Sequence, residues 1–410
     1  MTHGRILQEK ENNTRKMDRG IFMKKKILIG IITIIVILII VFGALYIIDH
    51  KRMEENEPVI FSTWGKQYSP KIDEENNKSE EQKEKQESNN INFALTMDDE
   101  ITTDTAWCGT FQLIWNDLKN DLAKQDIVLQ EDPENQIVKN LNKEDFKAEY
   151  LSESSYYKVY GHPTLELKNQ IEEAIKEKFN ETSDILNDFE WRKDGVEGDY
   201  FLYSMLKKEF EFPVKFDKLQ EGTFAGIYND VDYFGLKKEA DEQIRNQVEI
   251  LYYNSDEDFA VKLKTKQNDE VILAKGTEGE TFNEIYNNIN ENSSNYEGIK
   301  KFTEEDELKI PNIDFDEKKE ITYLRDKTFQ FSNGTLYKIE KAMQTIEFEL
   351  DEKGGKIKSE AGMMNREMAL LPAEQERKFY FDDEFTIFLK ETDKEKPYFA
   401  AKIQDITKFQ

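Results

Sequence analysis

Few residue types that carry out catalysis occur in this 410-residue sequence. It contains three histidines, His3, His50 and His162, and one cysteine, Cys108. Only His162 lies beyond residue 90, so no multi-histidine metal site can form in that part, and the HExxH zinc pattern is absent. A serine or cysteine dyad would have to use His162, in the loop-like "YGHPT", where a structural role is expected. The sequence therefore predicts no catalytic residues and no enzyme.

Glycine-rich and acidic segments give no cofactor signature either. "GTEGETF" and "DEKGGKIKS" complete neither a phosphate loop nor a dinucleotide fingerprint, and glycine turns explain both. Asp314 and Asp316 in "NIDFDEKKE" could bind calcium, but the EF-hand glycine pattern is missing. A lone Cys108 excludes an intramolecular disulfide and a cysteine zinc cluster, and we expect it to be buried. We expect neither a metal nor another cofactor.

The most unusual segment lies near the C-terminus, between strand-like patterns. "QTIEFEL" (344–350) alternates apolar and polar residues, and "FTIFLKE" (385–391) and "PYFAAKI" (397–403) also read as strands. The segment between them has a Gly-Gly pair and no clear period. Loops longer than about 12–15 residues are uncommon in compact domains and are usually functional or disordered. Leu350 to Phe381 is therefore the candidate functional segment.

The order of elements around this segment resembles the C-terminal part of serpins, the serine protease inhibitor superfamily. In serpins a Lys/Leu-x-Pro strand precedes a strand that ends in Glu-x-Gly at a hinge. An exposed reactive-centre loop, a Phe-x-x-x-Phe motif and a final hairpin follow. The matching segments are "KIP" (309–311), "EKG" (352–354) and "FDDEF" (381–385). Residues 248–273 resemble the preceding serpin hairpin more loosely.

The resemblance implies an α+β fold, with helices packed on large, mostly antiparallel sheets and a long exposed loop of the reactive-centre type. It implies a divergent serpin-like domain, and the heavy use of Lys, Ile, Asn and Glu would suit a low-GC Gram-positive bacterium. Serpin spacing assigns the hinge and the bait region to Glu352, Gly354 and Gly355, and to Glu367, Met368 and Ala369. The implied partner is an extracytoplasmic serine or cysteine protease.

The loop has the side-chain pattern that insertion into a sheet requires. In a strand, alternate side chains point to opposite faces, so one face can be buried while the other stays in water. One set of alternate residues is small or apolar: Gly355, Ile357, Ser359, Ala361 and Met363. The other set is mainly charged: Lys356, Lys358, Glu360, Gly362 and Met364. The first set is the predicted inserting face.

Departures from the serpin pattern leave the function open. Inhibitory serpins prefer threonine or serine after the hinge glycine and then a run of alanines, whereas this chain has Gly355, Lys356, Ile357 and Lys358. The Ser-Pro-x-Ser segment of serpins is not recognisable in residues 93–129. The chain is therefore predicted to be a membrane-tethered serpin-like protease inhibitor, with a non-inhibitory surface-binding or sensory module as the alternative. An exported α+β domain with an ordinary long hairpin loop is the simplest remaining interpretation.

The first ninety residues predict a membrane anchor and a stalk. Residues 1–26 carry eight Lys/Arg against three Asp/Glu, and Ile27 to Ile48 contains no charge. At about 1.5 Å per residue, this run spans about 33 Å, enough for a bilayer core. The basic tail (1–26) is expected inside the cell and the C-terminal domain (91–410) outside, behind a charged stalk (49–90). A signal peptide starting near Met23 is the alternative.

The net charge of −27 argues against a nucleic-acid partner, because no basic face is present. Apolar periodicity predicts helices over 109–122, 166–179 and 281–289. Strands are predicted over 200–206, 248–253, 259–265 and 270–275.

Overall fold

The computed structural model describes residues 91–102, 104–355 and 376–410. The predicted basic tail, membrane helix and stalk lie outside these residues, as do the bait region and the loop beyond Gly355. In the described part of the chain, no helix is both long and apolar enough to cross a membrane.

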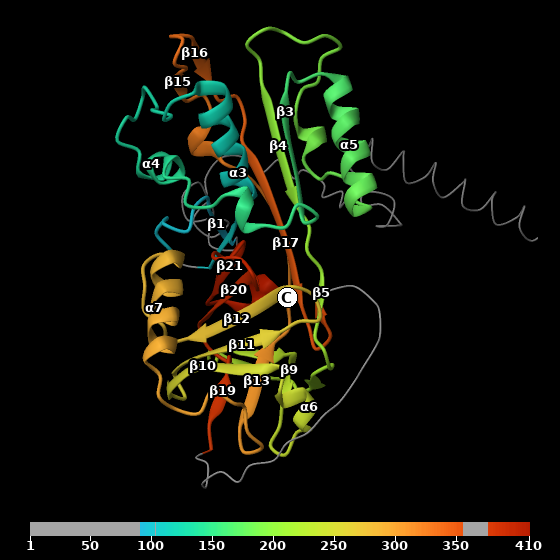
Figure 1. The fold of residues 1–410 in the computed structure, drawn as a ribbon, viewed down its shortest axis with the longest axis vertical. Helices are drawn as coiled ribbons and strands as arrows, with labels where there is room; N and C mark the ends of the chain where they lie inside the picture. The colour runs from blue at the N-terminus through green and yellow to red at the C-terminus, as the bar shows by residue number, and fades with distance from the viewer. Residues whose placement is uncertain (1–90, 103, 356–375) are drawn as a thin grey trace, which may run out of the picture. The chain divides into compact units, whose positions relative to one another are not determined.

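The largest layer is a seven-stranded sheet (Figure 1). Its order is β1 (Asn92–Ala94), β2 (Thr105–Cys108), β21 (Phe399–Ile403), β20 (Phe385–Glu391), β12 (Asp269–Lys275), β11 (Asp258–Lys264) and β10 (Val248–Ser255). Neighbouring strands are antiparallel except β1 and β2. β12 and β20 are buried along almost their whole length, which explains their continuous apolar sequences. The last two strands of the chain thus lie inside the sheet.

A second, four-stranded sheet has the order β19 (Lys378–Tyr380), β13 (Glu307–Pro311), β9 (Tyr233–Leu236) and β6 (Asp217–Lys218). β13 and β19 are parallel, and the other pairs are antiparallel. A Cβ atom on Gly235 would lie 1.9 Å from the carbonyl oxygen of Leu308, so this close approach of β9 and β13 requires glycine. Phe379 packs on Phe259 of β11 with ring centroids 5.3 Å apart, joining the two sheets.

Two separate antiparallel ladders complete the strands that matter for the site. One pairs β3 (Tyr156–Gly161) with β4 (Phe201–Leu206), and the other pairs β14 (Ile313–Glu320) with β17 (Met343–Leu350). Helix α5 (Leu165–Phe179) covers one face of the first ladder, where its apolar stripe packs on Phe201 and Tyr203. We call this face of both ladders outer, and the opposite face, which lies on α3 (Thr110–Asp117), inner.

The remaining elements are short, apart from α7. The helices are α4 (Gln136–Asn142), α6 (Glu242–Arg245) and α7 (Phe282–Asn295), and a π-helical turn (Leu118–Ala123) extends α3. The strands are β5 (Phe210–Glu211), β7 (Gly222–Phe224), β8 (Tyr228–Val231), β15 (Thr328–Gln330), β16 (Leu336–Lys338) and β18 (Gly354–Gly355). Single 3-10 turns cover Ala148–Tyr150, Leu186–Asp188, Thr322–Leu324 and Ile406–Phe409.

The fold class predicted from the sequence, α+β with helices on mostly antiparallel sheets, is confirmed. The three predicted helices correspond to α3 with its π-helical extension, α5 and α7. The predicted strands correspond to β4, β10, β11 and β12, and the three strands around the candidate loop to β17, β20 and β21.

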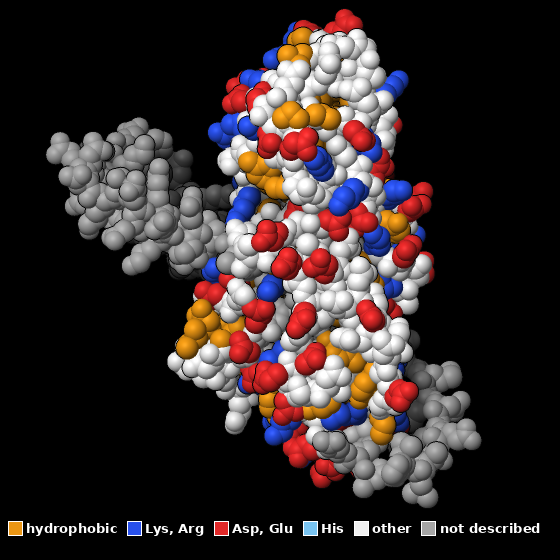
Figure 2. All heavy atoms as spheres, turned by 90° about the vertical axis from the view of Figure 1, so that its left-hand side faces the viewer, with side chains coloured by type: hydrophobic (Ala, Val, Ile, Leu, Met, Phe, Trp, Pro, Cys, Tyr) orange, Lys and Arg blue, Asp and Glu red, His pale blue; other side chains and the backbone are white. Residues whose placement is uncertain are grey.

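Acidic side chains are spread over the visible face of the described residues, and apolar side chains form only small separate patches there (Figure 2). This distribution agrees with the excess of 84 Asp/Glu over 57 Lys/Arg in the sequence. A field of this sign favours solubility and disfavours anionic partners.

Candidate functional site

The predicted hinge is a tight turn that links β17 to β5. After Leu350 the chain reverses, and Gly354 forms a bridge with Asp351. Gly354 then pairs with Glu211 and Gly355 with Phe210, both antiparallel. Because β17 and β5 meet at this turn, β17 and the strand leading into β5 run parallel to each other.

Only glycine fits at position 354. Its φ is +123°, in the region that L-amino acids rarely adopt, and a Cβ atom would lie 2.5 Å from the carbonyl oxygen of Phe210. The hinge glycine implied by the serpin resemblance is therefore required by this backbone.

Glu352 holds the turn in place from inside. Its side chain is 1% exposed and lies 3.0 Å from the Lys215 ammonium and 3.6 Å from that of Lys218. The carbonyl oxygen of Glu352 accepts a hydrogen bond from the N–H of Phe216 (2.9 Å). Burial alone would raise the pKa of Glu352, but the two lysines reverse this and hold its pKa below the usual value. The hinge is thus fixed by charge and by backbone bonds.

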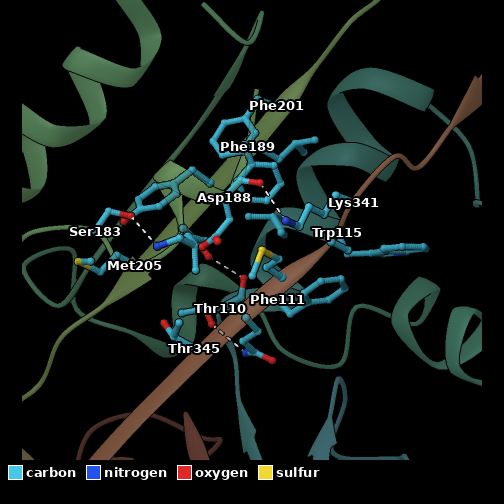
Figure 3. A pocket seen from close by; sticks show the side chains of 18 of the residues that line it. Thr110, Phe111, Trp115, Ser183, Asp188, Phe189, Phe201, Met205, Lys341 and Thr345 are labelled. Atoms are coloured by element: carbon cyan, nitrogen blue, oxygen red, sulfur yellow. Dashed lines mark hydrogen bonds between the residues drawn. The ribbon is translucent and has the colours of Figure 1, made fainter. Parts of the chain in front are cut away.

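A cavity of about 1130 Å³, which we call the slot, separates the two ladders (Figure 3). One wall is β4 with its continuation to Phe210, and the other is β17. The floor includes Thr110, Phe111 and Phe399. Within the described residues, neither β4 nor β17 has a ladder partner on the side that faces the slot.

Thr110, at the start of α3, fixes the inner edges of both walls. Ser204 of β4 donates a hydrogen bond to the Thr110 carbonyl oxygen (2.7 Å), and Gln344 of β17 donates to the Thr110 hydroxyl (3.0 Å). A strand inserted between these two parallel edges would run antiparallel to both, at the usual spacing of about 4.8 Å from each. Gln344 Oε1 is buried and has no hydrogen-bond partner among the described residues.

Residues 181–190, which we call the strap, connect α5 to β4 and cross the outer side of the slot. Lys318 of β14 donates to the carbonyl oxygen of Asp184 (3.0 Å) and to the Asp188 carboxylate (2.6 Å). Lys341, beside the start of β17, donates to the carbonyl oxygen of Asp188 (2.9 Å), as Figure 3 shows. Two lysines of the β14–β17 side therefore hold a segment that belongs to the β3–β4 side.

A charged network that sequence reasoning missed lies at the inner wall. Lys208 lies 3.0 Å from Asp269 and 2.8 Å from Glu391, and both carboxylates are almost fully buried. Burial raises the pKa of Asp269. Burial would also raise the pKa of Glu391, but Lys208 and the hydroxyl and N–H of Ser152 reverse this and hold the pKa of Glu391 below the usual value. A charged residue ending the apolar run "FTIFL" was the available sequence signal.

Where the described chain resumes after the loop, Arg377 anchors it. The guanidinium of Arg377 donates two hydrogen bonds to Asp306, from Nε (2.9 Å) and Nη2 (2.8 Å), and another to the carbonyl oxygen of Ile299 (2.8 Å). The Asp306 side chain has no exposed surface. This ion pair fixes the start of β19, and sequence reasoning also missed it.

The other predicted site residues divide clearly. Glu352, Gly354 and Gly355 are brought together at the hinge, whereas the bait region (Glu367, Met368, Ala369) and the inserting face (Ile357, Ser359, Ala361, Met363) lie outside the described residues. The contacts of His162 are structural: its Nδ1 lies 2.8 Å from the carbonyl oxygen of Asp199, and its ring stacks on Tyr200. Cys108 is buried and free. Asp314 and Asp316 do not belong to any group of three potential metal ligands in the part of the chain that the structure describes.

No protein-family model and no curated protein matches the chain. Among solved structures, a thyroxine-binding globulin in complex with thyroxine is similar, with 13% identity and a TM-score of 0.32 over 58% of this chain and 63% of that one. A tumour suppressing serpin has 13% identity and a TM-score of 0.38, over 58% and 65%. Serpin48 of the insect Tenebrio molitor has 11% identity and a TM-score of 0.32, over 68% and 72%. The chain spans less than two thirds of the length of the first two. Similarities of this size support no conclusion about activity.

Proposed function

We propose that this chain is a serpin-like protein in which the loop after Gly355 is bait for a protease and, once cut, fills the slot as a new strand. The observation that carries the proposal is the slot itself, a cavity of about 1130 Å³ between β4 and β17, neither of which pairs with another described strand on that side. Gly354 and Gly355 already pair with the end of the β4 wall. Extension of that short ladder is the simplest way to satisfy both free strand edges.

The register of the β4 wall supports the inserting face read from the sequence. Continuing the pairing of Gly355 with Phe210 matches Ile357 with Lys208, Ser359 with Leu206, Ala361 with Ser204, and Met363 with Leu202. Directly opposed residues of an antiparallel pair share a face. Ser204 reaches Thr110 and Phe210 is buried, so these positions face inward.

The β17 wall gives the same answer independently. Continuing the bridge between Asp351 and Gly354 matches Ile357 with Phe348, Ser359 with Ile346, and Ala361 with Gln344. Gln344, Ile346 and Phe348 are three of the four buried positions of β17, the fourth being Leu350. The two extended registers therefore both support an inner-face position for the small and apolar set of alternate residues.

The mechanism follows from this geometry. A serine or cysteine protease attacks the bond after Met368, within Glu367 to Ala369, and forms an acyl-enzyme with the new C-terminus. Insertion of the segment from Gly355 to about Met363 then displaces the attached enzyme toward the far end of the slot. The predicted membrane segment, Ile27 to Ile48, would hold the domain outside the cell and so favours an extracytoplasmic protease.

Limited proteolysis near Met368 is expected to raise the Tm of the protein by on the order of 10 °C or more. The reason is that a central strand adds hydrogen bonds on two sides, each worth about 1 kcal/mol net, and buries Ile357 and Met363. The measurement is calorimetry of the intact and the nicked chain, with mass spectrometry to locate the cut. An unchanged Tm after clean cleavage would refute insertion.

A non-inhibitory binding or sensory module is the second candidate. The hydrogen bonds of the strap favour this second candidate. Lys318 and Lys341 both bind Asp188 of the strap, which lines the slot, and these bonds would slow insertion. An inhibitor requires insertion faster than release of the protease. A module of this kind would become more stable on cleavage but would form no SDS-resistant complex with any protease that cuts it.

Replacing both Lys318 and Lys341 with alanine is expected to speed the conversion of the nicked protein about two- to fivefold, because partly exposed ion pairs of the strap are lost. The rate is measured from tryptophan fluorescence after rapid cleavage. Lys139→Ala, which removes an exposed ion pair on α4, is the matched control and should convert at the wild-type rate. Equal rates for all three proteins would mean that the strap does not limit insertion.

A further inference from the structure

The end of the slot that lies away from the hinge is lined by aromatic side chains. Phe111 and Trp115 of α3 line it, and so do Phe189 of the strap and Phe201 at the start of β4, as Figure 3 shows. Tyr337 of β16 also lines the cavity here. We call the part of the slot bordered by these five residues the aromatic end.

These residues belong to two separate apolar clusters. Phe111 and Trp115 are buried in one cluster, against which Tyr337 packs, and Phe201 is buried in another, against which Phe189 packs. The ring of Phe189 meets that of Phe201 edge to face, with centroids 4.9 Å apart. The slot lies between the two clusters. A molecule that contacts both would therefore remove apolar surface from water on two sides at once.

The aromatic end can be reached from the surface. Tyr200 and Leu336 both line the slot, yet Tyr200 is 40% exposed and Leu336 is 55% exposed. The ring centroid of Tyr200 lies 6.2 Å from that of Tyr337, which places the start of β4 beside the β15–β16 hairpin. These two exposed apolar side chains mark an opening for an apolar ligand.

Polar groups at the aromatic end disfavour an anion. The indole N–H of Trp115 donates to Asn142 (3.1 Å), and Lys341 donates to the carbonyl oxygen of Asp188 (2.9 Å). Arg192, another basic residue of the lining, is paired with Asp199. The strap itself carries four Asp/Glu and no Lys or Arg. A negatively charged ligand would meet this acidic cover, and the net charge of −27 adds to the repulsion.

The walls of the aromatic end suit a small molecule better than a peptide strand. A strand needs free backbone edges, which β4 and β17 supply only from Phe201 and Met343 toward the hinge. Around the aromatic end the lining comes from a helix, a loop and a hairpin, and it is their side chains that border the cavity. Ligand pockets typically occupy about 300–1,000 Å³ and are lined by apolar and aromatic side chains, so a part of the slot is large enough.

We propose that the aromatic end binds a flat aromatic small molecule that carries no negative charge. Its rings would lie against Phe111 and Trp115 on one side and against Phe189 and Phe201 on the other, in the offset or edge-to-face arrangements that aromatic groups prefer. This binding goes beyond the proposed function, because it requires neither a protease nor cleavage.

A matched pair of fluorescent probes tests the site on the intact full chain. N-phenyl-1-naphthylamine is uncharged, and 8-anilinonaphthalene-1-sulfonate has the same rings with an added sulfonate. The uncharged probe is expected to give saturable fluorescence at about one probe per chain, with a Kd on the order of 10 µM for a ligand of this size. The sulfonate should bind at least about tenfold more weakly, because its charge would enter an acidic, apolar site.

Ile114→Trp places the binding at the aromatic end. Ile114 of α3 is partly buried and lines the slot, so a larger ring there occupies the ligand's volume and should weaken binding of the uncharged probe at least about tenfold. Ile299→Trp is the matched control, since Ile299 is 39% exposed and does not line the slot, and it should bind as the wild type does. Phe189→Ala, which removes part of the opposite wall, should weaken binding severalfold and serves if Ile114→Trp does not fold.

The proposal is overturned if the uncharged probe shows no saturable binding, if both probes bind equally well, or if neither variant of the aromatic end weakens binding. It is also overturned if Ile299→Trp weakens binding as much as Ile114→Trp. None of these results would bear on the change in Tm after cleavage near Met368, so the ligand site and the proposed insertion can fail separately.

Discussion

Ala361→Arg is expected to leave the loop as cleavable as in the wild type but to abolish the gain in Tm that follows cleavage. The register that we propose for the inserted loop puts position 361 on the inner face, opposite Ser204 and Gln344. Beneath it lies Thr110, which is hydrogen-bonded to both walls. A guanidinium inserted there would be buried without a carboxylate partner, at a cost of several kcal/mol. That cost is comparable to the whole gain expected from the new strand. Calorimetry of the nicked variant is the measurement.

Lys358→Arg is the matched control for this prediction. It introduces the same side chain three positions away, at a position that the proposed register puts on the outer face and that already carries a long cationic residue in the wild type. The nicked control should gain as much Tm as the wild type. If Ala361→Arg gained stability equally, the assignment of the faces would be wrong. If the control also failed to gain stability, arginine would disturb the loop in some way unrelated to burial.

The turn at the hinge could be read from the sequence because it depends on local rules, whereas the inserting face stays a prediction that lies outside the described residues. Side-chain alternation has a period of two wherever a strand forms, and "EKGG" marks a turn through its glycines. The walls could not be predicted. β4 and β17 are separated by well over one hundred residues, and Thr110, which is hydrogen-bonded to both, lies far along the chain from each of them. The residues near position 357 in the sequence therefore do not indicate how β4, β17 and Thr110 are arranged.

The buried ion pairs were missed for a different reason. Lys208, Glu391 and Arg377 occur in a sequence with 34% charged residues, so no single charge stands out. Their partners are far along the chain, as with Arg377 and Asp306. The alternation of apolar and polar residues in a strand is the one pattern that could have indicated such pairs. A charged residue at a position where this alternation calls for an apolar one is buried and requires a partner.

The acidic pairs on β14 and β17 depend on strand pairing, which the sequence does not show. The sequence left calcium binding at Asp314 and Asp316 as a minor possibility and predicted no metal. The register opposes Asp314 to Glu349 and Asp316 to Glu347. Strand alternation places the two aspartates on one face, but only the register shows which residues they oppose.

Arg377→Leu is expected to lower the Tm of the intact protein by about 10 °C, because removing one partner of a buried ion pair costs about 3–5 kcal/mol. The variant leaves Asp306 fully buried, with the N–H of Thr303 as its remaining donor and the start of β19 unanchored. Thermal unfolding followed by circular dichroism is the measurement.

The double variant Asp306→Asn with Arg377→Gln separates lost charge pairing from lost packing. It keeps similar volumes and an oxygen acceptor for Thr303, and it removes both buried charges, so a substantial part of the Tm should return. Arg325→Leu is the control, since it breaks an ion pair with Glu320 at the surface and should leave the Tm almost unchanged. Equal losses for Arg325→Leu and Arg377→Leu would mean that burial of the pair is not what fixes β19. No recovery in the double variant would assign the loss to the hydrogen bonds of Arg377 with the backbone at Ile299 and Lys301. In either case the C-terminal end of the loop would be held by its backbone, and the ion pair would not be what anchors that end.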